Sequence, residues 1–392
     1  MSAVDLMNNI VAHSVRGMPA DAAFVTNMAD FSMELFKKSI KAGQNSLISP
    51  LSVTLTLSMV ANGADGETLA QLTALLSGDI PLAERNEYLY SYAKSLPSMV
   101  KSKLRIANSL WLRDDGDSLQ VQVDFLQKNA DYYSAAAFRT AFNDRTVRDI
   151  NNWVKSNTEG MIDQILDEIK ELDMLVLINA VVFEAEWKNV YFKGDVWKAD
   201  FTDINGTVRN VEFMYSTESG YLDDGRATGF IKPYANGGYS FVALLPNEGI
   251  SIENYIASLS GAVLLDTLTN RRQKALVLAS MPKFRYTYSA KMNDALKSLG
   301  IRDAFDKDMA DFRGMATTSF GNGNLYISEV LHKAYISVDE LGTKAGAVNS
   351  AVMTARGLPE IPKIVNLDRP FVYMIIDNAT DLPVFVGTLM TV

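Results

Sequence analysis

The sequence predicts an α+β fold built as a single domain. Helical patterns dominate the first part of the chain and strand patterns dominate the later part, an arrangement typical of α+β proteins. The 392 residues contain no linker, repeat or low-complexity tract at which the chain would divide, so we expect one large domain. Because 48% of the residues are hydrophobic and 21% are charged, the composition is that of a globular protein.

A first amphipathic helix is predicted after Pro19 and Asp21. Apolar side chains then recur every three or four residues, as they do on one face of a helix: Phe24, Met28, Phe31 and Leu35. We place the start of the domain at this helix. Residues 1–20 are accordingly an N-terminal extension, and residues 21–392 form the domain.

A second helix is predicted to begin at Ser49. The next residue is Pro50, and proline suits the first turn of a helix, where its missing N–H has no partner to lose. Ser52 follows in the same turn. The helical pattern ends at Gly63 and Gly66.

Two later segments have the pattern of buried strands. Residues 174–183 (MLVLINAVVF) are apolar except for Asn179, as expected of a strand covered on both faces. In LYISEVLHKAYISV, His332 shares one face of a strand with apolar side chains, namely Val330, Ala334 and Ile336. Both polar side chains are therefore expected to be buried, and each needs hydrogen-bond partners there.

The most informative segment is DELGTKAGAVNSAVMTARGLPEIPK (339–363), between two predicted strands. From Ala345 to Ala355 it has no charge, no Pro and one Gly, and its mostly small or β-branched side chains are typical of a strand. Loops of this length are usually functional or disordered. Its flanks indicate an exposed loop, because they are rich in Gly and Pro: Gly342, Gly357, Pro359 and Pro362.

The loop divides at Arg356. Because Pro lacks the N–H that a central strand must donate, the residues after Gly357 cannot join the middle of a sheet, whereas residues 343–355 can. Arg356 is a long cationic side chain followed by Gly, which suits a trypsin-like protease. We therefore predict a cleavable loop whose first half has a second conformation available.

In a strand formed by residues 343–354, side chains would alternate between two faces. One set is small, nearly neutral and fit for burial: Thr343, Ala345, Ala347, Asn349, Ala351 and Met353. Lys344 carries the only charge and would lie on the other, solvent-accessible face. A roughly twelve-residue strand entering a sheet gains on the order of ten hydrogen bonds at about 0.5–1.5 kcal/mol each. This gain is comparable with the stability of a whole domain.

The segment resembles the reactive-centre loop of the serpins, a family whose loop inserts into its own sheet after cleavage. Six residues match the family's hinge pattern: Glu340, Gly342, Thr343, Ala345, Gly346 and Ala347. Lys344 departs from the usual acidic residue, but its place on the solvent side should let insertion proceed. The family spaces its scissile residue sixteen positions after the hinge Glu, which again selects Arg356 and the bond to Gly357. The resemblance thus implies a reactive-centre loop at about 340–362.

Further matches lie elsewhere in the chain. The polar shutter beneath the centre of the serpin sheet is matched by four residues: Ser49, Ser52, Asn179 and His332. Trp187 matches the Trp of the breach, at the top of the sheet, where insertion begins. From the residues alone, His332 equally suits a satisfied core histidine, and Trp187 suits ordinary aromatic packing. Ordered matches cover almost everything from about Phe31 onwards, including residues 150–162, 281–289, 299–315 and 368–371.

The resemblance implies a serpin fold, with one domain, a large central mixed β-sheet, further sheets and about nine helices. It also implies a suicide-substrate inhibitor that traps a serine protease as a covalent acyl-enzyme, and we expect a monomer. Two alternatives stay open. The chain could be a non-inhibitory serpin with a binding or chaperone-like role, or it could inhibit elastase-like or subtilisin-like proteases through cleavage at Met353 to Thr354.

An enzymatic function finds little support. The sequence has no G-x-S-x-G elbow, no H-E-x-x-H motif and no P-loop, and GNGN (321–324) lacks the further glycine of a phosphate loop. Its two histidines, His13 and His332, lie in the polar extension and in the predicted core, so a histidine-based active site has few candidates. We expect no catalytic residue, no metal and no cofactor.

Charge and composition restrict the partners and the location. A net charge of -9 and a pI near 5.0 disfavour nucleic acids and heparin-like polyanions as partners.

The sequence contains no run of about 18 apolar residues that would predict a membrane span. The first residues show no basic start followed by an apolar core, so no signal peptide is visible. A secreted or cell-surface location is expected if a signal was trimmed, and a cytoplasmic location is also compatible. The absence of cysteine leaves the redox compartment open.

Overall fold

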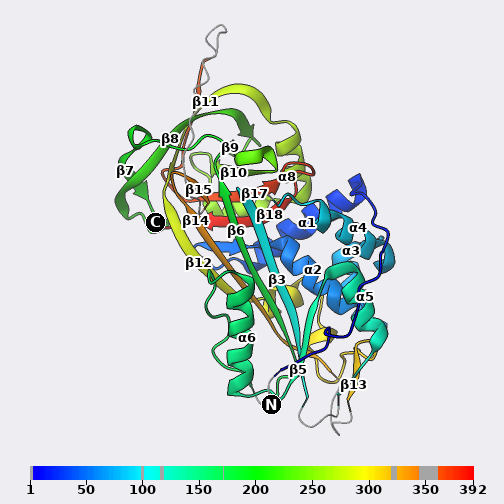
Figure 1. Ribbon diagram of the computed structural model, residues 1–392. Coiled ribbons are helices and arrows are strands. Elements are labelled where there is room, and N and C mark those ends of the chain that lie inside the picture. The colour runs from blue at the N-terminus through cyan, green and yellow to red at the C-terminus, as the bar shows by residue number, and fades with distance from the viewer. Residues whose placement is uncertain (1–2, 99–100, 115–118, 171, 319–324, 344–360) are drawn as a thin grey trace.

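Helices and sheets occupy different parts of the molecule in the computed structural model (Figure 1). The structure describes residues 3–392 except 99–100, 115–118, 171, 319–324 and 344–360. The first five helices gather on one side, at the right of Figure 1. The α-helices of the described residues are α1 (Ala22–Ser39), α2 (Pro50–Ala61), α3 (Gly66–Ser77), α4 (Leu82–Ser95), α5 (Val123–Tyr133), α6 (Asp144–Asn157), α7 (Ile252–Ser258), α8 (Gly261–Thr269) and α9 (Asn293–Ser298).

A seven-stranded mixed sheet forms the centre of the fold, with strand order β1-β5-β3-β6-β15-β14-β12. Strands β3 and β5 are parallel, as are β6 and β14, while β3 and β6 are antiparallel. The bounds are β1 (Val4–Asp5), β3 (Ser102–Arg113), β5 (Ala136–Thr140), β6 (Leu175–Glu186), β12 (Phe284–Lys291), β14 (Ile327–Val338) and β15 (Gly342–Thr343). The large central mixed sheet predicted from the sequence is therefore present.

A second sheet has nine strands, with order β16-β11-β8-β9-β10-β17-β18-β2 and β7 paired to β8. Its bounds are β2 (Ser46–Ile48), β7 (Val196–Thr202), β8 (Val208–Asp223), β9 (Ala227–Pro233), β10 (Tyr239–Pro246), β11 (Arg272–Pro282), β16 (Lys363–Asn366), β17 (Phe371–Asp377) and β18 (Pro383–Leu389). A small pair completes the strands of the described residues: β4 (Leu119–Val121) and β13 (Ala316–Thr318).

The two helices predicted near the N-terminus begin where their capping residues indicate. The Asp21 side chain accepts the Phe24 N–H at 2.8 Å and caps α1. All four apolar side chains of its predicted face are buried. Ser49 caps α2 with Pro50 at its first position, and the helix ends at Ala61, before both glycines.

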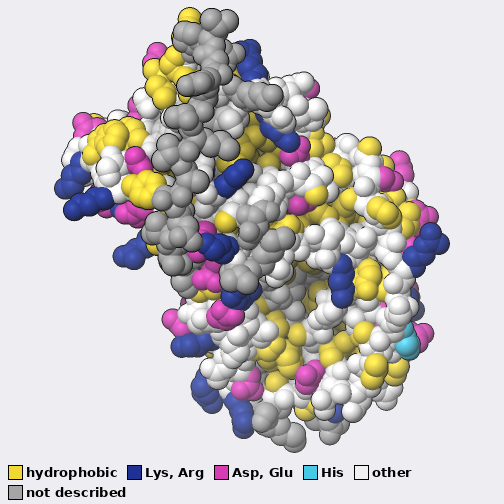
Figure 2. All heavy atoms as spheres, turned by 45° about the horizontal axis from the view of Figure 1, so that its top comes forward, with side chains coloured by type: hydrophobic (Ala, Val, Ile, Leu, Met, Phe, Trp, Pro, Cys, Tyr) yellow, Lys and Arg dark blue, Asp and Glu magenta, His cyan; other side chains and the backbone are white. Residues whose placement is uncertain are grey.

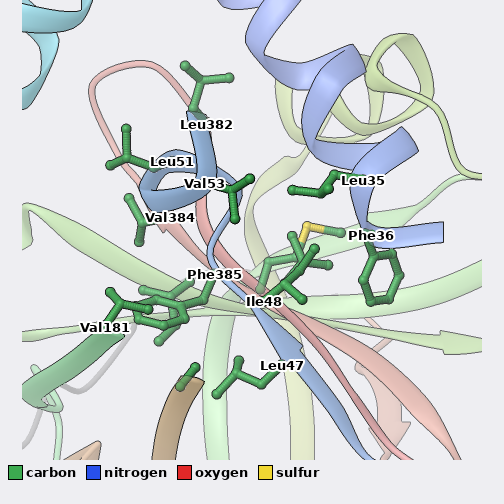
Figure 3. Packing of buried hydrophobic residues seen from close by; sticks show 14 of the residues in the cluster. Leu35, Phe36, Leu47, Ile48, Leu51, Val53, Val181, Leu382, Val384 and Phe385 are labelled. Carbon is green, nitrogen blue, oxygen red and sulfur yellow. The ribbon is translucent and has the colours of Figure 1, made fainter. Parts of the chain in front are cut away.

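Strand β6 runs through the centre of the core, and residues 175–183 are buried without exception. One face packs on the second sheet and α2, where Val181 lies together with Phe385, Leu47 and Ile48 (Figure 3). The other face packs under α6, in a smaller cluster that includes Ile178. Because both faces are covered, this strand is apolar at nearly every position, as the sequence predicted.

The N-terminal segment contacts the rest of the chain along its described length. Strand β1 pairs with the edge strand β5, and the Leu6 N–H donates to the Ala137 carbonyl at 2.9 Å. Further on, Gln127 of α5 donates to the Val11 carbonyl at 2.9 Å. Residues 3–20 therefore follow the sheet edge and the helices next to it, while the domain boundary at residue 21 stays a prediction.

Candidate functional site: the shutter and hinge of the central sheet

A row of polar side chains crosses the middle of the central sheet, on the face toward α2. Strand register places Asn108 of β3 beside Asn179 of β6, and Asn179 beside His332 of β14. Asn179 and His332 are 0% and 1% exposed. Ser49 and Ser52 lie opposite them, in the first turn of α2. The four residues predicted to form the shutter are thus brought together.

Hydrogen bonds connect these groups into one network. The Ser49 N–H donates to Nε2 of His332 at 3.4 Å, so the ring proton must lie on Nδ1, which donates to Oδ1 of Asn179. The Ser52 hydroxyl donates to Oδ1 of Asn108 at 2.8 Å. Asn179 in turn donates to Thr56 at 3.0 Å and to Asn108 at 3.1 Å. Every polar group of the row therefore has a partner, as burial requires.

Thr56 and Asn108 belong to this network but were not predicted from the sequence. A signal for Thr56 existed, because it follows Ser49 and Ser52 by seven and four residues and so lies on the same face of the helix. Asn108 lies in a strand of mixed composition. Only its register against Asn179 reveals its role, and that register is a long-range feature.

Burial holds His332 neutral. Removal of the ring from water lowers its pKa from 6.5 to about 4. Between these two values the unfolded chain binds a proton that the native protein does not, so native stability falls as the pH is lowered through this window, by about 3 kcal/mol in total. We expect His332→Gln to remove this contribution. Urea midpoints of both proteins between about pH 7 and about pH 4 measure it, and equal pH slopes would contradict it.

The hinge already lies in the sheet. Gly342 and Thr343 form β15, which separates the upper ends of β6 and β14 and pairs antiparallel with both. The sequence predicted that Gly342 opens the exposed loop and that Thr343 enters the sheet only after cleavage. For these two residues that prediction is wrong, because tertiary contacts hold them in the sheet of the uncut chain.

Gly342 is required by the closeness of β6. Its φ is +155°, and a Cβ atom built there would lie 2.0 Å from the Ala185 carbonyl oxygen and 2.7 Å from the Glu186 Cα. Any larger residue would push β15 away from its neighbour. Glycine at this position therefore allows the chain to turn from β14 into the sheet.

Thr343 is 0% exposed, and its hydroxyl lies 2.7 Å from the Tyr234 hydroxyl. Its side chain thus points into the protein, on the face that the alternation pattern predicted for it. Tyr234 stacks on Trp187 with ring centroids 4.5 Å apart. The Trp187 indole N–H donates to the Asp339 carbonyl at 2.8 Å. Trp187 therefore lies at the top of the sheet and contacts the hinge, besides packing as an aromatic side chain.

Both the side chain and the backbone of Glu340 are bound by neighbouring residues. Its carboxylate pairs with Lys283, which also pairs with Glu212 at 3.1 Å. Burial alone would raise the pKa of Glu340, but the hydrogen bond and the charge of Lys283 outweigh it and lower the pKa below its ordinary value. The backbone contributes as well, since the Glu340 carbonyl accepts the Tyr191 N–H at 2.9 Å.

The remaining predicted site residues lie outside the described part of the chain: Lys344, Ala345, Gly346, Ala347, Arg356 and Gly357. Their roles stay predictions. On the face in Figure 2, Lys and Arg side chains are interspersed with Asp and Glu, so the described residues there form no continuous basic area. Among the helices that the structure describes, none combines the length and apolar character needed to cross a bilayer.

Comparisons with known proteins agree with this geometry. A family model described as Serpin (serine protease inhibitor) matches residues 26–392. The native-state crystal structure of tengpin, a thermophilic serpin, has a TM-score of 0.95 and 52% identity and covers 100% of both chains. The latent state of tengpin has a TM-score of 0.85, with 96% of this chain and 100% of that chain covered. Leukocyte elastase inhibitor A of Rattus norvegicus is 30% identical over 380 residues, 91% of this chain and 96% of the relative.

The described residues are therefore more similar to the native than to the latent form of tengpin. A family match over nearly the whole chain, together with the central sheet and its hinge, identifies the fold as that of a serpin. Members of this family are in general protease inhibitors and not enzymes. The chain belongs to the serpin family.

Proposed function

We propose that this serpin is a suicide-substrate inhibitor of trypsin-like serine proteases and that Arg356 is its scissile residue. The catalytic Ser of the protease attacks the Arg356 carbonyl carbon, an ester bond forms, and the bond to the Gly357 nitrogen breaks. The leaving amine takes the proton that the serine gave up. Residues 344–354 then extend β15 into the sheet and carry the attached protease away before water hydrolyses the ester.

The observation that carries this proposal is the register of β15. Thr343 pairs with Ala185 of β6 and with Val338 of β14. A strand that continued antiparallel in this register would lie opposite Leu175, the first residue of β6, when it reached Met353. The length of β6 below β15 therefore matches the length of the segment that could insert. Arg356 would then lie beyond the end of the sheet.

The same register supports insertion despite Lys344. This residue would lie beside Glu184 of β6, on the outer face of the sheet, where Glu184 already lies 3.6 Å from Arg105. A cation placed there meets a carboxylate. The chain thus compensates for its departure from the usual acidic residue with a neighbouring acid.

The register also assigns a partner to Asn349, which would otherwise be an unfavourable polar residue in a buried strand. Six residues beyond Thr343, it would lie between Asn179 and His332, whose mutual hydrogen bond must break when a strand separates them. An amide can donate to one and accept from the other. Asn349 would therefore replace the contact that insertion removes.

We expect Asn349→Leu to lower the melting temperature of the cleaved protein, because it leaves two buried polar groups without partners, at about 1–3 kcal/mol each. The neighbouring change Ser350→Leu is the matched control. If the strand were inserted in the same register, a leucine here would face the apolar side chains of Ile178 and Leu331, so this change should cost little. Scanning calorimetry of the cleaved forms tests the difference, and equal melting temperatures would exclude this register.

The function itself is tested with trypsin. We expect the protein to form a complex with trypsin that survives denaturation and boiling, and we expect Arg356→Ala to abolish it while leaving the thermal unfolding of the uncut protein unchanged. Mass spectrometry of the released C-terminal fragment should give a sequence that begins at Gly357. A wild-type protein that is merely cleaved would contradict inhibition and favour a non-inhibitory role in binding or as a chaperone.

One relative favours a second target class. The rat protein that is 30% identical is named Leukocyte elastase inhibitor A. Cleavage after Val352, Met353 or Thr354 would suit elastase-like or subtilisin-like proteases. If those enzymes form the stable complex, the released fragment will begin before Gly357, and Arg356→Ala will not affect it.

A further inference from the structure

A buried ion pair lies directly behind the hinge. Lys232 of β9 and Glu218 of β8 are only 2% and 7% exposed, and their charged atoms are 2.8 Å apart. Lys232 occupies a core position, because it shares a face of its strand with the fully buried Phe230. Burial of two charges costs more than an apolar pair of similar size, so stability alone does not account for this pair.

The contacts of Lys232 lead to the hinge. Its ammonium group lies 4.2 Å from the ring centroid of Tyr191 and 5.4 Å from that of Trp187. Both distances are in the range of attraction between a cation and an aromatic face. Tyr191 is also connected to Glu218 through Ser216. The Tyr191 hydroxyl lies 3.3 Å from the Ser216 hydroxyl, which donates to the Glu218 carboxylate at 2.7 Å. The pair therefore fixes two aromatic residues from one side.

The backbones of the same two aromatic residues hold the hinge from the other side. The Trp187 N–H donates to the Leu341 carbonyl at 2.8 Å, and the Tyr191 N–H donates to the Glu340 carbonyl at 2.9 Å. Trp187 also stacks on Tyr234, whose hydroxyl contacts Thr343. A shift of the rings would therefore move the groups that keep β15 in the sheet.

We propose that the Lys232–Glu218 ion pair is a positioning element that keeps the first two residues of the inserting strand paired before any cleavage occurs. The positioning role itself does not depend on the proposed inhibitory function, but its effect on protease trapping does. With β15 already formed, insertion extends an existing strand and does not have to begin a new one. Insertion should therefore be faster, and the strand can enter before the acyl-enzyme is hydrolysed. Loss of the pair should shift the outcome from trapped protease to released protease.

Two variants and one control separate positioning from stability. Lys232→Met removes the cation but leaves a buried Glu218, whereas Lys232→Met combined with Glu218→Leu removes both charges and restores an apolar contact. Arg85→Met is the control, since Arg85 is a fully buried cation in α4 whose guanidinium lies over Phe24, away from the hinge. If the pair only supported stability, the double variant would behave as wild type in every measurement.

The first measurement is hydrogen exchange of the uncut proteins, followed by mass spectrometry of peptides that cover residues 186–192. We expect exchange at Trp187 and Tyr191 to be about tenfold faster or more in both Lys232 variants and unchanged in the Arg85 control. Wild-type exchange in the double variant would overturn the proposal. This result does not depend on whether the protein inhibits any protease.

The second measurement is the number of inhibitor molecules consumed per protease inactivated. We expect it to rise about threefold or more in both Lys232 variants and to stay at the wild-type value in Arg85→Met. An unchanged number in the double variant would overturn the role in trapping. If wild type itself traps no protease, the proposed function fails, while the exchange result still decides whether the pair positions the hinge.

Discussion

Cleavage after Arg356 is expected to raise the midpoint of thermal unfolding by about 10–20 °C. Insertion of residues 344–354 would add on the order of ten hydrogen bonds at about 1 kcal/mol each. With the unfolding entropy typical of a chain of this length, a gain of about 10 kcal/mol corresponds to roughly 12 °C. Burial of Ala, Val and Met surface adds about 25 cal/mol per Å².

Circular dichroism or calorimetry of the intact protein and of the purified, cleaved protein measures this rise. Cleaved Thr343→Arg protein is the control, because it has the same cut but a blocked hinge. If wild type and this control melt alike after cleavage, the cut loop does not enter the sheet. The stored energy on which trapping depends would then be absent.

Thr343→Arg is expected to convert the inhibitor into a substrate. Thr343 is fully buried against Tyr234, so a longer cation at this position would have to leave the sheet or be buried without a carboxylate. An unpaired buried charge costs about 3–5 kcal/mol. Strand entry should slow accordingly, and hydrolysis of the acyl-enzyme should then outpace it.

Titration of a fixed amount of trypsin measures the change. We expect more than about ten molecules of this variant to be consumed per protease inactivated, against a number close to one for wild type. Thr343→Ser keeps the hydroxyl and should remain an inhibitor. A variant with Arg at this position that still traps protease one-to-one would show that this face of the strand is not buried during insertion.

Much of the shutter could be predicted from the sequence because its members interrupt regular patterns. Asn179 is the only polar residue in the apolar segment 174–183, and His332 lies on an apolar face, so each indicates a buried polar site. Ser49 was recognisable from the helix start at Pro50. Asn108 was not predicted, because its strand is not uniformly apolar and its partner Asn179 is far away in sequence.

The hinge was predicted less well, for a different reason. Composition indicates what residues 343–355 can become, but not that Gly342 and Thr343 already pair with the sheet. Two residues have almost no intrinsic preference as a strand, and contacts with Tyr234 and Trp187 hold them there. The burial of Lys232 was not predicted, because a lysine in a strand ordinarily indicates a face toward water.

The parallel pairing of β6 with β14 at the centre of the sheet has a thermodynamic consequence for loop insertion. A strand that continued β15 would run opposite in direction to both neighbours, so one parallel junction would be replaced by two antiparallel ones. Parallel ladders have slanted hydrogen bonds and are slightly weaker per residue than antiparallel ladders. The uncut sheet therefore has one of its weaker, parallel junctions along the line where it has to open, and the product would have antiparallel junctions there.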